Sequence, residues 1–318
     1  MATRQTQSYL RNLFARRGMA PQHRYGQNFL IDLNLHEVIA KAAEVGPGDV
    51  VLEIGPGAGA LTALMAESAS AVVAVEIDPG MAQLTREAVQ GRPNVRVLEG
   101  DALAGKHTIS PQALDCIRAA MAVSADRRFK LVANLPYNVA TPVLSNLLVH
   151  PELRPALLVA TIQLELAERL RAAPASSDYG GLSILVQALS DVEIVRTLSP
   201  KVFWPQPKVE SAIVRLRPRG DLREAVGDLP WFHEVVRKVF LHRRKNLRGV
   251  LHTLWKDEWT KPDVDELLGG LGLDGSIRAE AMDVEEFVGL AAALKARFGG
   301  RGGSIGDENS GADVEEAG

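Results

Sequence analysis

The residues best suited to chemistry in this sequence are Asn134-Leu135-Pro136-Tyr137, a run that directly follows an apolar, strand-like segment. An asparagine side-chain oxygen and the next backbone carbonyl can accept the two hydrogens of an exocyclic amine such as that of adenine, while proline fixes the turn. The tyrosine ring offers a face on which an unstacked base can lie. The run therefore fits methyl transfer to an adenine amine, which proceeds by alignment and desolvation without a strong base. A polar turn that only closes a strand is the alternative.

A glycine-rich turn lies between a strand-like and a helix-like run, in the stretch VVLEIGPGAGALT. Gly55, Gly57 and Gly59 let the backbone turn tightly and approach a ligand with no Cβ in the way. The same spacing satisfies the dinucleotide fingerprint, with Ala60 at its last position. The glycines alone therefore leave both an NAD enzyme and a methyltransferase open.

Acidic residues at the ends of three strand-like runs extend this site. Glu76 is placed to accept hydrogen bonds from a ribose, which both cofactor classes contain. Glu53 precedes the first glycine, and Asp101 follows a later strand, where it can accept from an adenine amino group. This arrangement resembles the S-adenosylmethionine methyltransferases, whose loop holds the amino-acid end of the cofactor. Acids that only cap helices are the competing interpretation.

Hydrophobic patterning predicts the elements that position these residues. Short apolar, β-branched runs alternate with helix-like stretches as far as Leu216, which is typical of βαβ units and a parallel, doubly wound sheet. The predicted strands cover residues 50–54, 71–77, 95–98, 129–133, 157–164, 192–195 and 211–216. The predicted helices cover residues 60–68, 79–90, 111–123, 141–149, 231–241, 247–254, 263–268 and 284–297.

The pattern changes after Gly220, where apolar residues recur only at helical spacing. We therefore predict an α/β protein with three parts. A Rossmann-like methyltransferase domain with a basic N-terminal arm covers residues 1–220, and a smaller all-helical RNA-recognition domain covers residues 221–298. A disordered acidic tail covers residues 299–318.

Composition excludes several classes of protein. With 46% hydrophobic and 24% charged residues in 318, the chain can bury a core and is not disordered overall. It contains no long apolar segment and a single cysteine, so we expect a cytoplasmic protein without a membrane span. The seven histidines are scattered, so no metal site is predicted.

The N-terminal part of the sequence is basic. Five arginines precede the first acid, Asp32, and their local charge suits phosphate contacts. They are Arg4, Arg11, Arg16, Arg17 and Arg24.

Seven motifs in order resemble the ribosomal RNA adenine dimethyltransferases: HRYGQNFLID, VLEIGPGAGALT, VEID, EGDAL, NLPYNVATPVL, FWPQPKVESAIVRL and FLHRRKNLRGVL. The resemblance is to the KsgA type, which dimethylates two adjacent adenosines near the 3′ end of small-subunit rRNA. It implies that Phe203 helps Tyr137 to sandwich the target base. It also implies S-adenosylmethionine as cofactor, bound by Asn28, Leu30, Gly55, Glu76, Asp101 and Asn134, and we add Gly57 from the loop.

The last motif carries the predicted RNA contacts. Its basic residues, expected along one helical face, are Arg243, Arg244, Lys245 and Arg248. The expected partners are 16S rRNA and the immature small ribosomal subunit, with the protein acting as a monomer. A large-subunit methylase of the macrolide-resistance type, an assembly factor that only binds, and a DNA adenine methylase remain alternatives. An NAD dehydrogenase is the weakest, because it leaves Asn134–Tyr137 without a role.

Overall fold

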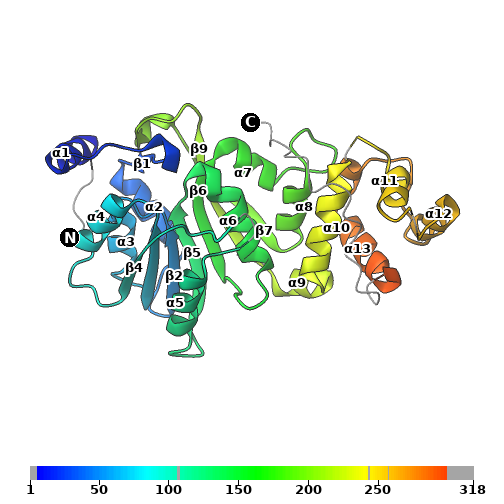
Figure 1. Ribbon diagram of the computed structural model, residues 1–318, viewed down its shortest axis with the longest axis horizontal. Coiled ribbons are helices and arrows are strands. Elements are labelled where there is room, and N and C mark those ends of the chain that lie inside the picture. The colour runs from blue at the N-terminus through cyan, green and yellow to red at the C-terminus, as the bar shows by residue number, and fades with distance from the viewer. Residues whose placement is uncertain (1–5, 106–107, 243, 257, 299–318) are drawn as a thin grey trace. The chain divides into compact units, whose positions relative to one another are not determined.

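The computed structural model describes residues 6–105, 108–242, 244–256 and 258–298, in two compact units (Figure 1). The first unit holds the chain up to Arg171 together with Leu189–Gly220. The second holds Ala172–Ala188 and the described residues from Asp221 onward. Ala172–Ala188 was predicted in the first domain and instead belongs to the second unit, because its helix α8 (Gly181–Gln187) packs on α10 (Leu229–Leu241). The predicted acidic tail lies outside the described residues.

The first unit is built on a sheet that has seven strands within the described residues, in the order β4-β3-β2-β5-β6-β9-β7. The strands are β2 (Asp49–Ile54), β3 (Ala71–Glu76), β4 (Val95–Glu99), β5 (Arg128–Asn134), β6 (Leu157–Gln163), β7 (Ser190–Leu198) and β9 (Ser211–Pro218). Each predicted strand is confirmed to within a few residues. Strands β4, β3, β2, β5 and β6 are parallel to one another, but β9 is antiparallel to both β6 and β7. The prediction of a parallel sheet is wrong there, since no crossover helix separates β7 from β9.

The central strands are continuous apolar runs and are buried on both faces, because helices cover both sides of the sheet (Figure 1). Val51 of β2, Leu131 of β5 and Val159 of β6 are fully buried. The helices of this unit are α1 (Gln7–Arg17), α2 (Leu33–Ala42), α3 (Ala60–Met65), α4 (Pro79–Ala88), α5 (Pro111–Met121), α6 (Tyr137–Val149) and α7 (Leu164–Leu170). A separate antiparallel pair joins β1 (Phe29–Leu30) to β8 (Phe203–Trp204).

The elements described in the second unit are helices, as the sequence predicts, together with one isolated β-bridge between Asn246 and Arg278. Besides α8 and α10 it contains α9 (Gly220–Val226), α11 (Leu247–Leu254), α12 (Lys261–Gly270) and α13 (Val284–Phe298). Helix α10 packs on α13, and the rings of Phe240 and Phe287 stack with centroids 5.6 Å apart. The Asp228 carboxylate caps α10 by accepting from the Trp231 backbone N–H at 3.0 Å.

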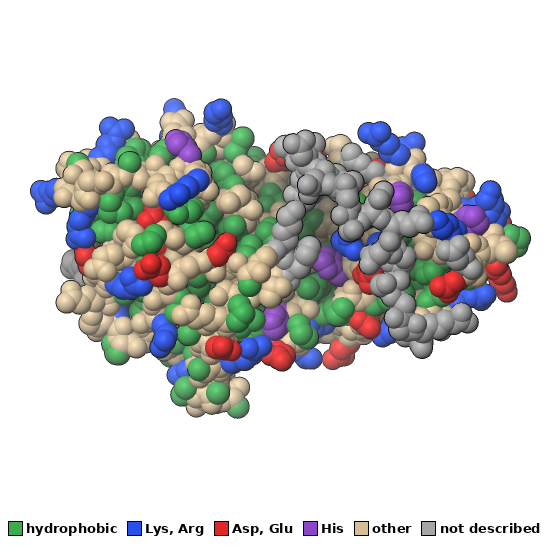
Figure 2. All heavy atoms as spheres, in the orientation of Figure 1, with side chains coloured by type: hydrophobic (Ala, Val, Ile, Leu, Met, Phe, Trp, Pro, Cys, Tyr) green, Lys and Arg blue, Asp and Glu red, His purple; other side chains and the backbone are tan. Residues whose placement is uncertain are grey.

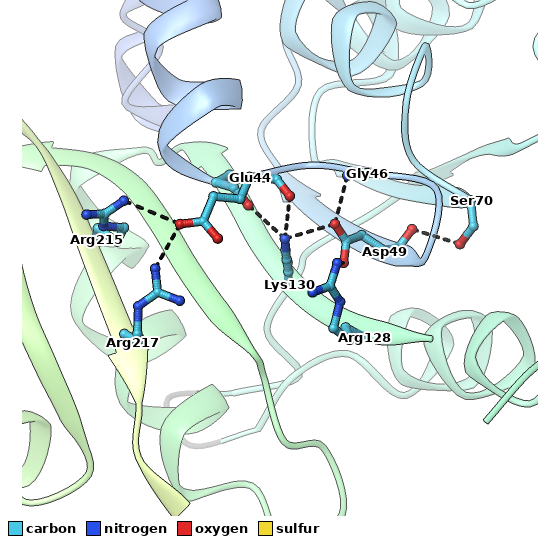
Figure 3. A network of polar contacts seen from close by, with 9 residues as sticks. Glu44, Gly46, Asp49, Ser70, Arg128, Lys130, Arg215 and Arg217 are labelled. Carbon is cyan, nitrogen blue, oxygen red and sulfur yellow. Dashed lines mark hydrogen bonds and ion pairs between the residues drawn. The ribbon is translucent and has the colours of Figure 1, made fainter. Parts of the chain in front are cut away.

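A buried ion pair ties the amino ends of the central strands to helix α2 (Figure 3). The Lys130 ammonium lies 2.8 Å from an Asp49 carboxylate oxygen, and the two side chains are 3% and 0% exposed. Lys130 also donates to the backbone carbonyls of Ala43 and Glu44, at 2.9 and 2.7 Å. The network lies at the edge of the sheet opposite the carboxyl ends of the strands. Its role is therefore to hold the sheet on which the site is built.

Candidate active site

A pocket opens where β2, β3 and β5 end, the edge at which open α/β sheets bind ligands. All predicted catalytic and cofactor-binding residues except Phe203 line it. They are Asn28, Leu30, Gly55, Gly57, Glu76, Asp101, Asn134, Leu135, Pro136 and Tyr137. The sequence motifs that suggested a cofactor loop and an amine-binding turn thus share one cavity.

Glu76 is held by the backbone of the glycine-rich loop. One carboxylate oxygen accepts the Gly57 N–H and the other accepts the Asp78 N–H, each at 3.0 Å. Burial raises the pKa of Glu76, and these two hydrogen bonds oppose the rise by favouring the charged form. Each oxygen keeps a further lone pair, so the carboxylate can accept from the hydroxyls of a ribose.

Gly57 is one position where the loop requires glycine. Its φ is +59°, and an added Cβ would lie 2.9 Å from Cε1 of Phe29. The close approach of Phe29 presses the β1 segment against the loop. The absence of a side chain is therefore part of the cradle for the cofactor.

We expect Gly57→Ala to weaken binding of S-adenosylmethionine about tenfold or more, because the loop must shift away from Phe29 and from Glu76. Gly91→Ala is the matched control, since Gly91 also has positive φ (+80°) but has open space around it and lies outside the pocket. Both variants should lose about 1–2 kcal/mol of stability from backbone strain. Calorimetric titration of both with the cofactor checks this, and equal affinities would contradict it.

Glu53 is a second buried acid of the pocket. It is 2% exposed, and its Oε2 atom has no hydrogen-bond partner within the described residues. Burial, with a smaller contribution from the charge of Glu76, raises the pKa of Glu53 to about 8, while the Thr62 hydroxyl opposes the rise. Near pH 7 this side chain is consequently protonated and able to donate.

The raised pKa of Glu53 predicts a pH dependence of stability. Because the usual pKa is 4.5 and the folded one about 8, the unfolded chain releases this proton first, so stability falls as pH rises between these values. Glu53→Gln removes this titration and should flatten the decline. The melting temperature should therefore fall less between pH 5 and pH 7.5 in the variant than in the wild type. Thermal unfolding of wild type and variant across this range measures the effect, and parallel profiles would refute it.

The segment before β1 is clamped over the pocket by Asp78. One Asp78 oxygen accepts from the side-chain amides of Gln22 and Gln27, both at 3.0 Å. The other caps helix α4 by accepting the Gly80 N–H at 2.9 Å. This carboxylate therefore fixes the GQNFL segment to the helix that follows Glu76.

Asn134 has its side chain oriented by the same segment. Its amide nitrogen donates to the backbone carbonyl of Asn28 at 3.0 Å, which leaves the side-chain oxygen as an acceptor. Pro136 packs against Gly55, where an added Cβ would lie 3.2 Å from the proline ring. The Tyr137 hydroxyl is 2.7 Å from the Ser211 hydroxyl, and burial raises the pKa of the tyrosine. The turn is thus fixed at both ends.

Phe203 is a correction to the sequence-based prediction. Its side chain is 2% exposed and belongs to a core cluster that includes Leu30 and Leu35, so it offers no face to a base. The reason is the pairing of β8 with β1, which turns Phe203 inward opposite Leu30.

The predicted basic helical face is also corrected. Arg244 and Lys245 lie in a turn, because the side chain of Asn246 accepts the Gly249 N–H at 2.8 Å and starts α11 at Leu247. Arg248 is on the helix but forms a bidentate pair with Asp265 of α12. Arg243 lies outside the described residues.

Several pocket residues were not singled out from the sequence. They are Tyr25, His36, Ile77 and Asn138, each adjacent or close to a recognised motif. Ile77 follows Glu76 and is 40% exposed, a large apolar side chain at the mouth of a cofactor site. Its exposure, which the sequence does not show, is what identifies Ile77 as a candidate contact for a ligand.

No group of three or more His, Cys, Asp or Glu side chains among the described residues is arranged to hold a metal ion. Among the same residues, no helix combines the length and apolar character needed to cross a membrane.

Comparison with known proteins agrees with this geometry. The sequence model of the family described as ribosomal RNA adenine dimethylase matches residues 19–287. A ribosomal RNA small subunit methyltransferase A from Moorella thermoacetica is 39% identical, over 89% of this chain and 96% of that protein. One from Phenylobacterium zucineum is 38% identical, over 91% and 93%.

Two solved structures share the fold. A dimethyladenosine transferase from Plasmodium falciparum superposes with a TM-score of 0.69 at 25% identity, over 84% of this chain and 97% of that one. The 23S rRNA methyltransferase ErmE gives a TM-score of 0.59 at 28% identity, over 84% and 100%. With the match over most of its length and the two-part site in one pocket, the chain belongs to the ribosomal RNA adenine dimethylase family.

Proposed function

We propose that this S-adenosylmethionine-dependent enzyme dimethylates the 6-amino groups of two adjacent adenosines near the 3′ end of 16S rRNA. The observation that carries the proposal is the orientation of Asn134. Its amide nitrogen is engaged by the Asn28 carbonyl, so its oxygen remains to accept a hydrogen from the substrate amine. This acceptor lines the same pocket as Glu76 and Asp101.

The pocket has the features that S-adenosylmethionine requires. We assign Glu76 to the ribose and Asp101 to the adenine amine. We assign Glu53 Oε2, which has no hydrogen-bond partner among the described residues, to the polar amino-acid end. Gly57 supplies a cradle that a Cβ would fill. When bound, the cofactor supplies an electrophilic methyl group on a sulfonium.

The residues of the chain then align the nucleophile. The Asn134 oxygen and the Leu135 carbonyl accept the two amine hydrogens, which orients the nitrogen lone pair out of the adenine plane. The ring of Tyr137, fixed by Ser211, supports the base by stacking. The N–C bond forms as the S–C bond to the methyl group breaks, and the methylated nitrogen, which is then cationic and strongly acidic, releases its proton to solvent. Because the residues of the chain only orient and desolvate the amine, no ionised general base is needed.

The choice of substrate subunit is supported by the relatives. Proteins named for the small subunit are 38–39% identical over about nine-tenths of the chain, whereas the 23S rRNA methyltransferase is 28% identical over 84%. We further infer that the enzyme acts as a monomer on the immature small subunit and contributes to its biogenesis.

The test is methyl transfer from labelled S-adenosylmethionine to purified undermethylated small and large subunits, in parallel. We expect label in small-subunit RNA and none above background in the large subunit. Label in large-subunit RNA alone would move the enzyme to the macrolide-resistance type while keeping its chemistry.

A further inference from the structure

The N-terminal arm, defined here as residues 6–31, is basic and firmly anchored. It contains no acidic residue. Helix α1 buries Leu10 and Phe14, and Phe14 packs against Met81 and Leu84 of α4. Figure 2 shows Lys and Arg side chains gathered over the part of the first unit where Figure 1 places α1. The arm therefore presents its charges from a fixed position.

The arginines of the arm differ in what holds them. Arg17 forms two hydrogen bonds with Glu87, at 3.0 and 2.6 Å, so its charge is neutralised within the protein. Arg11 instead lies over the ring of Trp204, with its guanidinium carbon 5.8 Å from the ring centroid. Arg24 lies over Tyr25 at 4.5 Å and donates to the Gln22 side chain at 2.9 Å. Within the part of the chain that the structure describes, neither Arg11 nor Arg24 pairs with a carboxylate.

Aromatic support leaves an arginine available for an anion. A ring face orients the guanidinium plane but does not cancel its charge, and N–H groups at the edge remain free to donate. A phosphate accepts such donors in a bidentate geometry. Arg11 and Arg24 are thus held in place and still carry full positive charge.

Both supporting rings are connected to the pocket wall. Arg24 and Tyr25 line the pocket directly. Trp204 pairs with Phe29 across β1 and β8, and Phe29 lines the pocket and contacts Gly57. An RNA strand that delivers an unstacked adenine to Tyr137 must lead its flanking phosphates past this wall.

We propose that Arg11 and Arg24 bind the RNA phosphates that flank the target adenosine, so that the N-terminal arm is a docking surface for the substrate strand. The inference rests on the proposed function, since it assumes an RNA adenine as the substrate. Of the five N-terminal arginines whose charge suits phosphate contacts, the proposal selects the two that rest on aromatic rings. Arg248, in the basic run before α11, is instead paired with Asp265.

The test compares Arg11→Gln/Arg24→Gln with Arg17→Gln, which removes an already neutralised charge from the same arm. We measure KM for undermethylated small subunits, and the salt dependence of binding to an RNA fragment of the 16S 3′ end. The double variant should raise KM about tenfold or more and flatten the log–log salt slope by about 0.7 per lost phosphate contact. Arg17→Gln should stay within about twofold of wild type, and Arg11→Lys/Arg24→Lys should largely restore the slope.

Far-UV circular dichroism and thermal unfolding check that the variants remain folded, and their melting curves should overlay that of the wild-type enzyme. The proposal is overturned if the double variant keeps the wild-type slope, or if Arg17→Gln loses as much. Failure of the proposed function itself looks different, because the wild-type enzyme would then leave small subunits unlabelled.

Discussion

Asn134→Ala is expected to lower kcat for methyl transfer by about 10²–10³-fold, the usual cost of removing one preorganised hydrogen-bonding group from a transition state. The variant loses the acceptor that orients the amine, and it also frees the Asn28 carbonyl. The apparent affinity for RNA should change far less, because stacking on Tyr137 is retained. Single-turnover rates with undermethylated small subunits measure the loss.

The matched control for this variant is Asn34→Ala. Asn34 is exposed at the start of α2, where its backbone N–H donates to the Asp32 side chain. Its activity should be that of wild type. If Asn134→Ala retained more than about a tenth of the wild-type kcat, a smaller loss than one transition-state hydrogen bond gives, the assignment of Asn134 would be wrong.

Lys130→Met is expected to cost the first unit roughly 3–5 kcal/mol, the range for breaking a buried ion pair from one side. The change leaves the Asp49 carboxylate, which is fully buried, with Arg128 and the Gly46 N–H as its remaining partners. It also removes the donor for the Ala43 and Glu44 carbonyls.

Urea unfolding followed by circular dichroism measures this loss. Lys41→Met, on the exposed face of α2, makes the same chemical change and should shift stability by no more than about 0.5 kcal/mol. Equal midpoints for the two variants would contradict a stabilising role for the buried pair.

The strands and the two halves of the site could be predicted because their signals are local. Val51, Leu131 and Val159 lie in unbroken apolar runs, which in an α/β chain indicate strands buried on both faces. The glycine-rich loop and the Asn134–Tyr137 turn each end such a strand. Parallel strands bring their carboxyl ends to one edge of the sheet, and the two motifs meet there in one pocket.

The errors have non-local causes. Phe203 is turned inward by pairing with β1, about 170 residues earlier in the chain, and no local pattern encodes that partner. Helix α1 was not predicted, because its polar and arginine-rich sequence lacks a clear apolar face. It is stabilised by burial of Phe14 against α4, which is a contact with a distant part of the chain. Asn246 is different, because an asparagine before an apolar helix is a recognisable N-cap. It agrees with the predicted helix over 247–254, but it places Arg244 and Lys245 before that helix rather than on its face.

The most direct test of the central claim is mass spectrometry of the 3′-terminal fragment of 16S rRNA, after undermethylated small subunits have reacted with the enzyme and S-adenosylmethionine. We predict two adjacent N6,N6-dimethyladenosines, which are absent when Asn134→Ala is used. Methylation at any other nucleotide, or none in the small subunit, would contradict the account.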